Sequence, residues 1–94
     1  MDTLFNMRAF VCVAETGSFT AAAQRMSLTT SYVSRAVATL ETHLRTRLLH
    51  RTTRRIALTE AGQRYLLRCE QILAYIDEAE AEAGEANAHP VGVL

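Results

Sequence analysis

The feature that most constrains the fold is residues 18–62, where two helical patterns meet at a short turn and a basic hairpin follows. Ser18 is a favourable cap for a helix over 19–26, because its side chain can accept hydrogen bonds from the free amides of the first turn. Residues 27–29 make the turn, and Thr29 caps the second helix. This order of parts predicts a mainly α winged helix-turn-helix, with three helices and a two-stranded wing.

The helix after the turn, residues 30–43, is predicted to have one buried side and one polar side. Its apolar stripe steps by four, three and four residues through Val33, Val37, Leu40 and Leu44. Its first turns carry mostly small polar side chains and then an arginine: Thr29, Thr30, Ser31, Tyr32, Ser34 and Arg35. A helix that reads bases in a DNA major groove needs short hydrogen-bonding residues and a long donor. A solvated helix face has the same pattern, so the neighbouring turn and hairpin favour a recognition helix.

Two short apolar strands, residues 48–50 and 56–58, flank the tip of the hairpin. Three of the five tip residues are arginines, and the tip consists of Arg51, Thr52, Thr53, Arg54 and Arg55. Like charges repel there, so the arginines are not a device for stability. We interpret the tip as a wing on the DNA backbone, with one arginine in a minor groove, for which we assign Arg54. A solvated turn is the other interpretation.

The net charge of zero conceals two halves of opposite sign. Residues 1–58 hold eight arginines against three acids, which gives +5, and residues 59–94 hold two arginines against seven acids, which gives −5. The chain contains no lysine, so all ten residues of the Lys and Arg class are arginines. The planar guanidinium of arginine can bind phosphate or guanine through two hydrogen bonds at once. The first half therefore suits a partner rich in phosphate, and the second half does not.

The last helix is predicted to follow a Thr59 cap and to run to about Ala83, too far to pack wholly on a small domain. Its apolar side chains recur at heptad spacing, which predicts a dimer interface made by Tyr65, Cys69, Ile72, Leu73, Ile76 and Ala79. Such a stripe can also pack on its own domain, but beyond about Leu73 the domain cannot reach it. The acidic end of the helix is expected to fray, and a linker is expected from Gly84 onward.

The remaining features narrow the class of protein. A first helix is predicted from residue 2 or 3 to Glu15, with Gly17 ending it. Cys12 and Cys69 lie in apolar helical patterns, which favours two buried free thiols over a disulfide. There is no run of about eighteen apolar residues, so no membrane span is expected, and the N-terminus lacks the layout of a signal peptide.

Enzymes and RNA-binding modules are weakly supported. The three histidines have no metal-ligand spacing, and Asp2 and Asp77 are the only aspartates. An RNA-binding module usually exposes several aromatic residues for stacking, and Tyr32 alone offers little. A helical dimerisation module would explain the long last helix but not the arginine-rich hairpin.

Three segments resemble the DNA-binding domain of LysR-type transcriptional regulators: FVCVAETGSFTAAA at 10–23, SYVSRAVATLE at 31–41 and LLHRTTRRIALTEAG at 48–62. The resemblance covers nearly the whole chain. It implies a cytoplasmic bacterial regulator that forms a homodimer through antiparallel linker helices, binds a palindromic duplex-DNA site, and forms higher oligomers at full length. It also implies that no cofactor binds this part, because a further domain normally binds a small-molecule inducer, and that the chain is a piece of a longer protein.

Two positions depart from the family's pattern. Many relatives carry Gln, which can contact adenine, where this chain has Thr30. Many also carry Gly where this chain has Arg45, so that either the helix ends differently here or Arg45 adopts a strained left-handed conformation.

Together these patterns divide the chain into a winged helix-turn-helix over 1–58, a dimerisation helix over 59–84 and a hinge over 85–94. The function that they indicate is sequence-specific binding of duplex DNA by a dimeric transcriptional regulator. The alternative is a helical interaction module without specific DNA binding.

Overall fold

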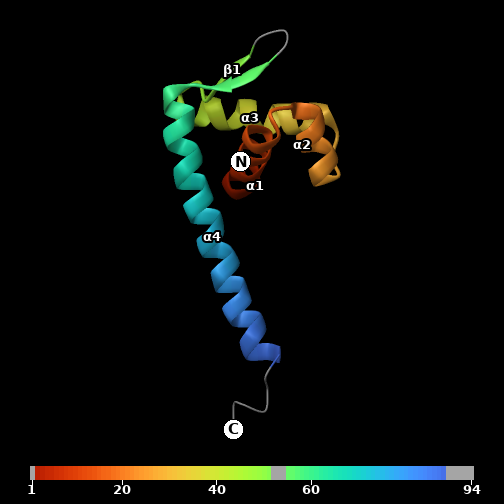
Figure 1. Ribbon diagram of the computed structural model, residues 1–94, viewed down its shortest axis with the longest axis vertical. Helices are drawn as coiled ribbons and strands as arrows, with labels where there is room; N and C mark the ends of the chain where they lie inside the picture. Colours follow the sequence, from red (N-terminus) through yellow and green to blue (C-terminus); the bar gives the residue numbers. More distant parts are fainter. Residues whose placement is uncertain (1, 52–54, 89–94) are drawn as a thin grey trace.

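Four helices and one hairpin make up the fold of this computed structural model, which describes residues 2–51 and 55–88. The elements are α1 (Thr3–Thr16), α2 (Phe19–Met26), α3 (Thr30–Leu44), β1 (Leu49–Arg51), β2 (Ile56–Leu58) and α4 (Glu60–Ala88). The first three helices form a head, the hairpin lies beside α3, and α4 runs away from the head (Figure 1). The predicted winged helix-turn-helix with a long final helix is confirmed.

Side-chain caps start three of the helices where the sequence predicts them. The hydroxyl oxygens of Ser18, Thr29 and Thr59 each accept from the backbone N–H three residues along, at 3.1, 3.1 and 2.9 Å. Each cap satisfies an amide that the helix itself cannot bond, which contributes about 1 kcal/mol.

The first three helices end on residues in the left-handed conformation. These residues are Gly17 (φ 74°), Ser27 (φ 58°) and Arg45 (φ 53°). Glycine adopts this conformation without strain, whereas it costs a residue with a Cβ atom roughly 1–2 kcal/mol. Of the two alternatives for Arg45, the structure therefore has the strained left-handed one, with α3 ending at Leu44, one residue beyond the predicted range of 30–43.

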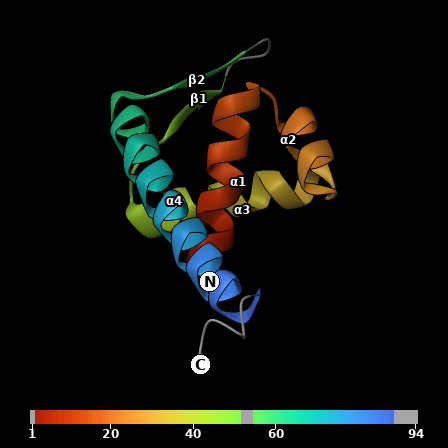
Figure 2. The same cartoon turned by 60° about the horizontal axis from the view of Figure 1, so that its bottom comes forward.

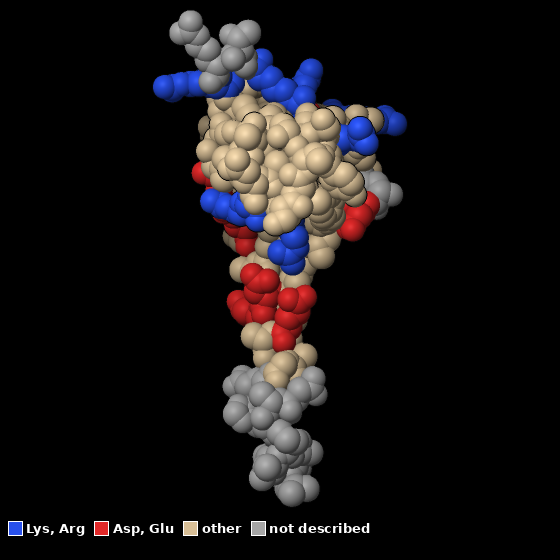
Figure 3. Space-filling view, turned by 90° about the vertical axis from the view of Figure 1, so that its right-hand side faces the viewer, with Lys and Arg blue, Asp and Glu red and all other residues tan. Residues whose placement is uncertain are grey.

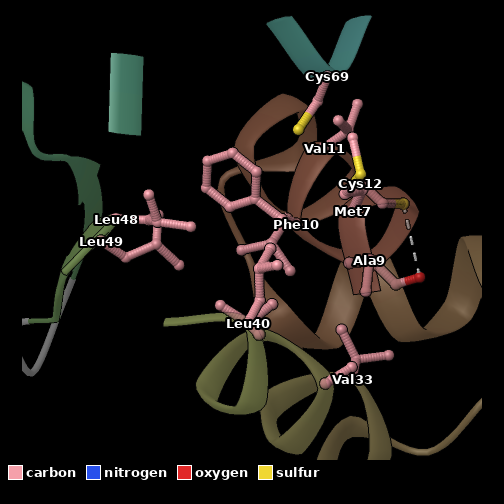
Figure 4. Packing of buried hydrophobic residues seen from close by; sticks show 14 of the residues in the cluster. Met7, Ala9, Phe10, Val11, Cys12, Val33, Leu40, Leu48, Leu49 and Cys69 are labelled. Atoms are coloured by element: carbon pink, nitrogen blue, oxygen red, sulfur yellow. Dashed lines mark hydrogen bonds between the residues drawn. The ribbon is translucent and has the colours of Figure 1, made fainter. Parts of the chain in front are cut away.

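Helix α1 forms the centre of the head and packs against α2, α3 and α4 (Figure 2). Phe10 is fully buried in the middle of this packing and faces side chains from α3 and from the start of the wing, among them Leu40 and Leu48 (Figure 4). The predicted α3 stripe is confirmed, because Val33, Val37 and Leu40 are inaccessible to solvent and Leu44 is half-buried.

The two strands pair antiparallel, with Leu49 opposite Leu58 and Arg51 opposite Ile56. Strand β1 begins one residue later than predicted. The reason is that the N–H of Leu48 donates to the Glu41 carboxylate at 2.8 Å instead of to the opposite strand, whereas its carbonyl still accepts from the N–H of Thr59, the residue opposite it in the register, at 3.0 Å. Positions 52–54 of the predicted wing tip lie outside the described residues.

Helix α4 extends to Ala88, beyond the end predicted near Ala83, so the expected linker from Gly84 and hinge over 85–94 begin too early. Residues 85–88 are Glu, Ala, Asn and Ala, and the high helix propensity of Ala and Glu outweighs the unfavourable placement of acids at this end. The helix has 29 residues, or about 43 Å.

The left-handed C-cap of α3 yields a prediction about stability. Arg45→Gly should raise the free energy of unfolding by about 0.5–1 kcal/mol, because glycine relieves the strain but loses more entropy on folding. Urea or thermal unfolding measures the change. Arg45→Ala removes the same charge and keeps the Cβ atom, so it should not stabilise the fold. Equal gains in both variants would show that charge, not backbone strain, is the cause.

Candidate nucleic-acid interface

Helix α3 and the hairpin lie together at the end of the molecule opposite the C-terminus of α4 (Figure 1). Several basic side chains line this end in the space-filling view, and acidic side chains lie below them toward and along α4 (Figure 3). Further basic side chains lie lower on the head, beside acidic ones, so the separation of charge along the chain is in part also a separation in space (Figure 3).

The predicted recognition residues differ in how far solvent can reach them. Thr30, Ser31 and Arg35 are exposed, and Ser34 is half-buried. The Thr29 hydroxyl is exposed too, but it is the cap of α3 and accepts from the N–H of Tyr32. The exposed face of α3 thus offers two short hydroxyl groups and one long cation, as a base-reading helix requires.

Arg35 is the long donor on this face. Within residues 2–51 and 55–88 its guanidinium forms no ion pair. The only acid on α3, Glu41, is buried and bonded elsewhere. The Arg35 guanidinium can therefore bind an acceptor in a partner without first breaking an ion pair within the described ranges.

The Tyr32 ring lies on the flank of α3 that faces the start of α1. It contacts Phe5 edge to face, with ring centroids 5.6 Å apart and an interplanar angle of 86°. Half of Tyr32 stays exposed (52%), and with Arg35 it lines an open hollow of about 290 Å³. The sequence alone groups Tyr32 with the polar face, whereas in the structure its ring also packs against that of Phe5.

Arg51 has a structural role that the wing prediction does not include. Its guanidinium lies 3.5 Å from the Glu41 carboxylate and over the Phe19 ring, 5.1 Å from the centroid. It thus links β1 to both α3 and α2. Of the other predicted wing residues, Arg55 is exposed, and Thr52, Thr53 and Arg54 lie outside the described residues.

Glu41 is the functional residue that the sequence interpretation missed, since it counted only as one acid in the basic half. Its side chain is 8% exposed, and one carboxylate oxygen accepts from the N–H groups of Leu48 and Leu49 at 2.8 and 3.2 Å. The other oxygen pairs with Arg51 and, at 3.7 Å, with Arg47. The signal in the sequence was an acid directly beside the apolar stripe of α3.

Some of the α4 residues predicted to form the dimer interface pack against the head, and others are exposed to solvent. Cys69 is fully buried and Tyr65 and Leu73 pack against the core, so Cys69 has no surface to offer a partner, in contrast to the prediction. The physical reason is that these residues cover α1. Farther along, Ile72 is 44% exposed and Tyr75 76% exposed. Leu67, on another side of the helix, is also exposed (62%). From Ile72 onward, the exposed apolar side chains are those that the head does not cover.

Both cysteines are free and buried, as predicted. Burial raises the pKa of the Cys69 thiol to about 11, so the thiol is protonated near neutral pH and acts as an apolar packing group. In the described part of the chain, no three His, Cys, Asp or Glu side chains are placed to hold a metal ion. The helices described here include none that is long and apolar enough to cross a membrane.

The part of the sequence that forms the three helices, the turn and the wing matches a known family. The family model of bacterial regulatory helix-turn-helix proteins of the lysR family matches residues 4–63. This chain belongs to the LysR family.

Two relatives and one solved structure illustrate the match. The chain is 52% identical to an HTH-type transcriptional regulator of Xanthomonas campestris over 99% of this chain and 26% of the relative. It is 46% identical to an HTH-type transcriptional repressor of Pseudomonas aeruginosa over 100% of this chain and 30% of that relative. The crystal structure of the BenM_DBD/catB site 1 DNA complex superposes with a TM-score of 0.85 at 28% identity, over 89% of this chain and 93% of that one.

These relatives are transcriptional regulators by name and not enzymes. The chain spans only about a quarter to a third of their length. The winged helix-turn-helix of the family is thus the part present here.

The buried carboxylate that joins α3 to the wing yields a second prediction. Glu41→Ala should lower the free energy of unfolding by on the order of 3 kcal/mol, because it leaves two buried N–H groups without an acceptor. Chemical denaturation measures this change. Glu15→Ala is the matched control, since it removes an exposed ion pair with Arg25 and should cost about 1 kcal/mol or less. Equal effects in the two variants would contradict the role assigned to Glu41.

Proposed function

We propose that this chain binds duplex DNA in a sequence-specific way and thereby regulates transcription. The observation that carries the proposal is that the exposed polar face of α3 and the basic hairpin lie at one end of the molecule, away from the acidic stem. The superposition on a LysR-family domain whose structure contains DNA supports the same use of this end.

In this mechanism α3 lies in the major groove and the wing lies on the DNA backbone. Ser31 and Ser34 are short enough to let the helix approach base edges, and Arg35 can reach the two acceptors of a guanine. Thr30 is a shorter reader than the glutamine of many relatives. Arg54, which lies outside the described residues, is assigned to the minor groove on the basis of the sequence, because narrow A·T-rich segments attract arginine.

The part of α4 from Ile72 onward is proposed to hold a homodimer. Ile72, Ile76 and Ala79 recur at spacings of four and three residues, Tyr75 lies next to Ile76, and all four keep apolar surface exposed or half-exposed. Antiparallel pairing of two such helices would place two heads on a palindromic site. The rest of the protein, beyond this chain, is proposed to bind a small-molecule inducer and to form higher oligomers.

Electrostatics provides the first test of DNA binding. If a dimer neutralises roughly six phosphates, the logarithm of the association constant should fall with the logarithm of salt concentration at a slope of about −5. Fluorescence anisotropy with a labelled duplex across a salt series measures the slope. A slope near zero would favour the alternative, an interaction module without DNA binding.

Arg35→Ala tests the recognition face. It should weaken binding to a selected duplex by about 1–3 kcal/mol and reduce the preference for that duplex over a scrambled one, because alanine cannot donate to a base. Arg25→Ala, which removes an arginine paired with Glu15, is the matched control and should leave the preference intact. Unchanged specificity in Arg35→Ala would mean that the recognition face is assigned wrongly.

Ile72→Arg tests the dimer. It places a charge in the proposed interface, which is prohibitive without a partner charge, yet Ile72 is exposed enough in the single chain for the head to fold. Sedimentation should show a monomer, and binding to a palindromic duplex should weaken. Leu67→Arg is the control, because Leu67 is exposed (62%) but lies about 140° around the helix. A dimeric Ile72→Arg variant would place the interface elsewhere.

A further inference from the structure

An open, arginine-lined hollow of about 390 Å³ lies where the C-terminal end of α3 meets the start of the wing. Three of its lining residues are Arg45, Arg47 and Arg51, which come from the C-cap of α3, the connection to β1 and β1 itself. Ala38, Glu41 and Thr42 form its α3 side. None of the base-reading or wing residues assigned above lines this hollow except Arg51.

The charges around the hollow do not cancel. Glu41 is its only acidic lining residue, and its buried carboxylate already accepts two backbone N–H groups. Arg51 is held near that carboxylate at 3.5 Å, whereas the pair with Arg47 is longer, 3.7 Å, and the Arg47 side chain is 73% exposed. Three cations facing one anion leave the hollow with a net positive charge.

Arg45 contributes a cation with no acidic partner in the described ranges. It is exposed, and among the residues that the structure describes it forms no ion pair. It also has a left-handed backbone, φ 53°, where a side chain costs stability and glycine would not. Strained positions of this kind concentrate at functional sites, which makes the side chain of Arg45 a candidate for binding.

The hollow continues the recognition face. Ser31, Arg35, Ala38 and Thr42 follow one another at spacings of four, three and four residues, so they lie along one side of α3. A duplex seated on Ser31 and Arg35 would therefore bring its sugar-phosphate backbone toward the C-terminal end of the helix.

We propose that this hollow is a phosphate-binding site, in which Arg45 and Arg47 donate to the oxygens of one backbone phosphate of the bound duplex. Arg51, held by Glu41 and stacked on Phe19, adds to the positive field. The site rests on the proposed DNA-binding function and adds to it an anchor at the far end of the recognition helix. Backbone contacts fix the register of a protein on DNA without reading its sequence.

The test compares DNA binding by the 94-residue chain and its Arg45→Gly, Arg45→Gln and Arg47→Gln variants. The probes are a duplex selected from a random library with the unaltered chain and a scrambled duplex of the same composition. Each variant should bind both duplexes more weakly by a similar factor, on the order of threefold to tenfold, and the salt slope should become shallower by about 0.9 for each phosphate that is no longer neutralised. Arg25→Gln, in which the arginine removed is paired with Glu15, should leave affinity and slope unchanged.

Arg45→Gly separates binding from folding, because it should raise the melting temperature while it weakens DNA binding. The proposal is overturned if the arginine variants keep the affinity and salt slope of the unaltered chain, or if they lose only the preference for the selected duplex. It is also overturned if inorganic phosphate alone, at constant ionic strength, stabilises the unaltered chain and not Arg45→Gln while the two bind DNA equally, since the hollow would then hold free phosphate and not a phosphate of the duplex. Absence of any DNA binding by the unaltered chain would instead refute the proposed function.

Discussion

The structure depends on one buried carboxylate, that of Glu41, which joins the recognition helix to the wing. It accepts the N–H groups of Leu48 and Leu49 and pairs with Arg51. A buried acceptor with several charge-assisted bonds fixes direction as well as distance, so the hairpin has one orientation relative to α3. The same short segment also positions α4, because the Thr59 hydroxyl donates to the carbonyl of Arg47 at 2.7 Å and a side chain at Gly62 would overlap the carbonyl oxygen of Leu48. The elements assigned to the major groove, the DNA backbone and the dimer therefore meet at residues 47–49.

Helix α4 serves two purposes along its length. Its first turns complete the core by placing Tyr65 and Cys69 against α1, where the Tyr65 ring lies 5.8 Å from that of Phe10. Its later turns extend past the head and keep Ile72 and Tyr75 exposed. Because the same heptad pattern runs through both parts, the transition depends on how far the head extends along the helix.

The arginines of the basic half do not all have the same role. Arg25 is paired with Glu15, and Arg51 is bound to Glu41 and stacked on Phe19, so both contribute to the architecture. Arg35 and Arg45 are exposed on or beside the outer face of α3 and form no ion pair in the described ranges. A count of charges predicts the sign of the electrostatic field, whereas the pairing of each guanidinium decides which arginines can meet a phosphate or a base without first breaking an ion pair.

Local features of this protein could be predicted from its amino-acid order alone. Caps at Ser18, Thr29 and Thr59, the buried stripe of α3 and the hairpin follow from interactions within a few residues, and all were predicted to within one residue. Packing between distant parts of the chain settled the rest: that Glu41 binds the start of the wing, that Arg51 belongs partly to the architecture, and that Cys69 faces α1 instead of a partner. The reason is that a helical or heptad pattern specifies which side chains share a face but not which surface that face will meet. Only the packed chain supplies that surface.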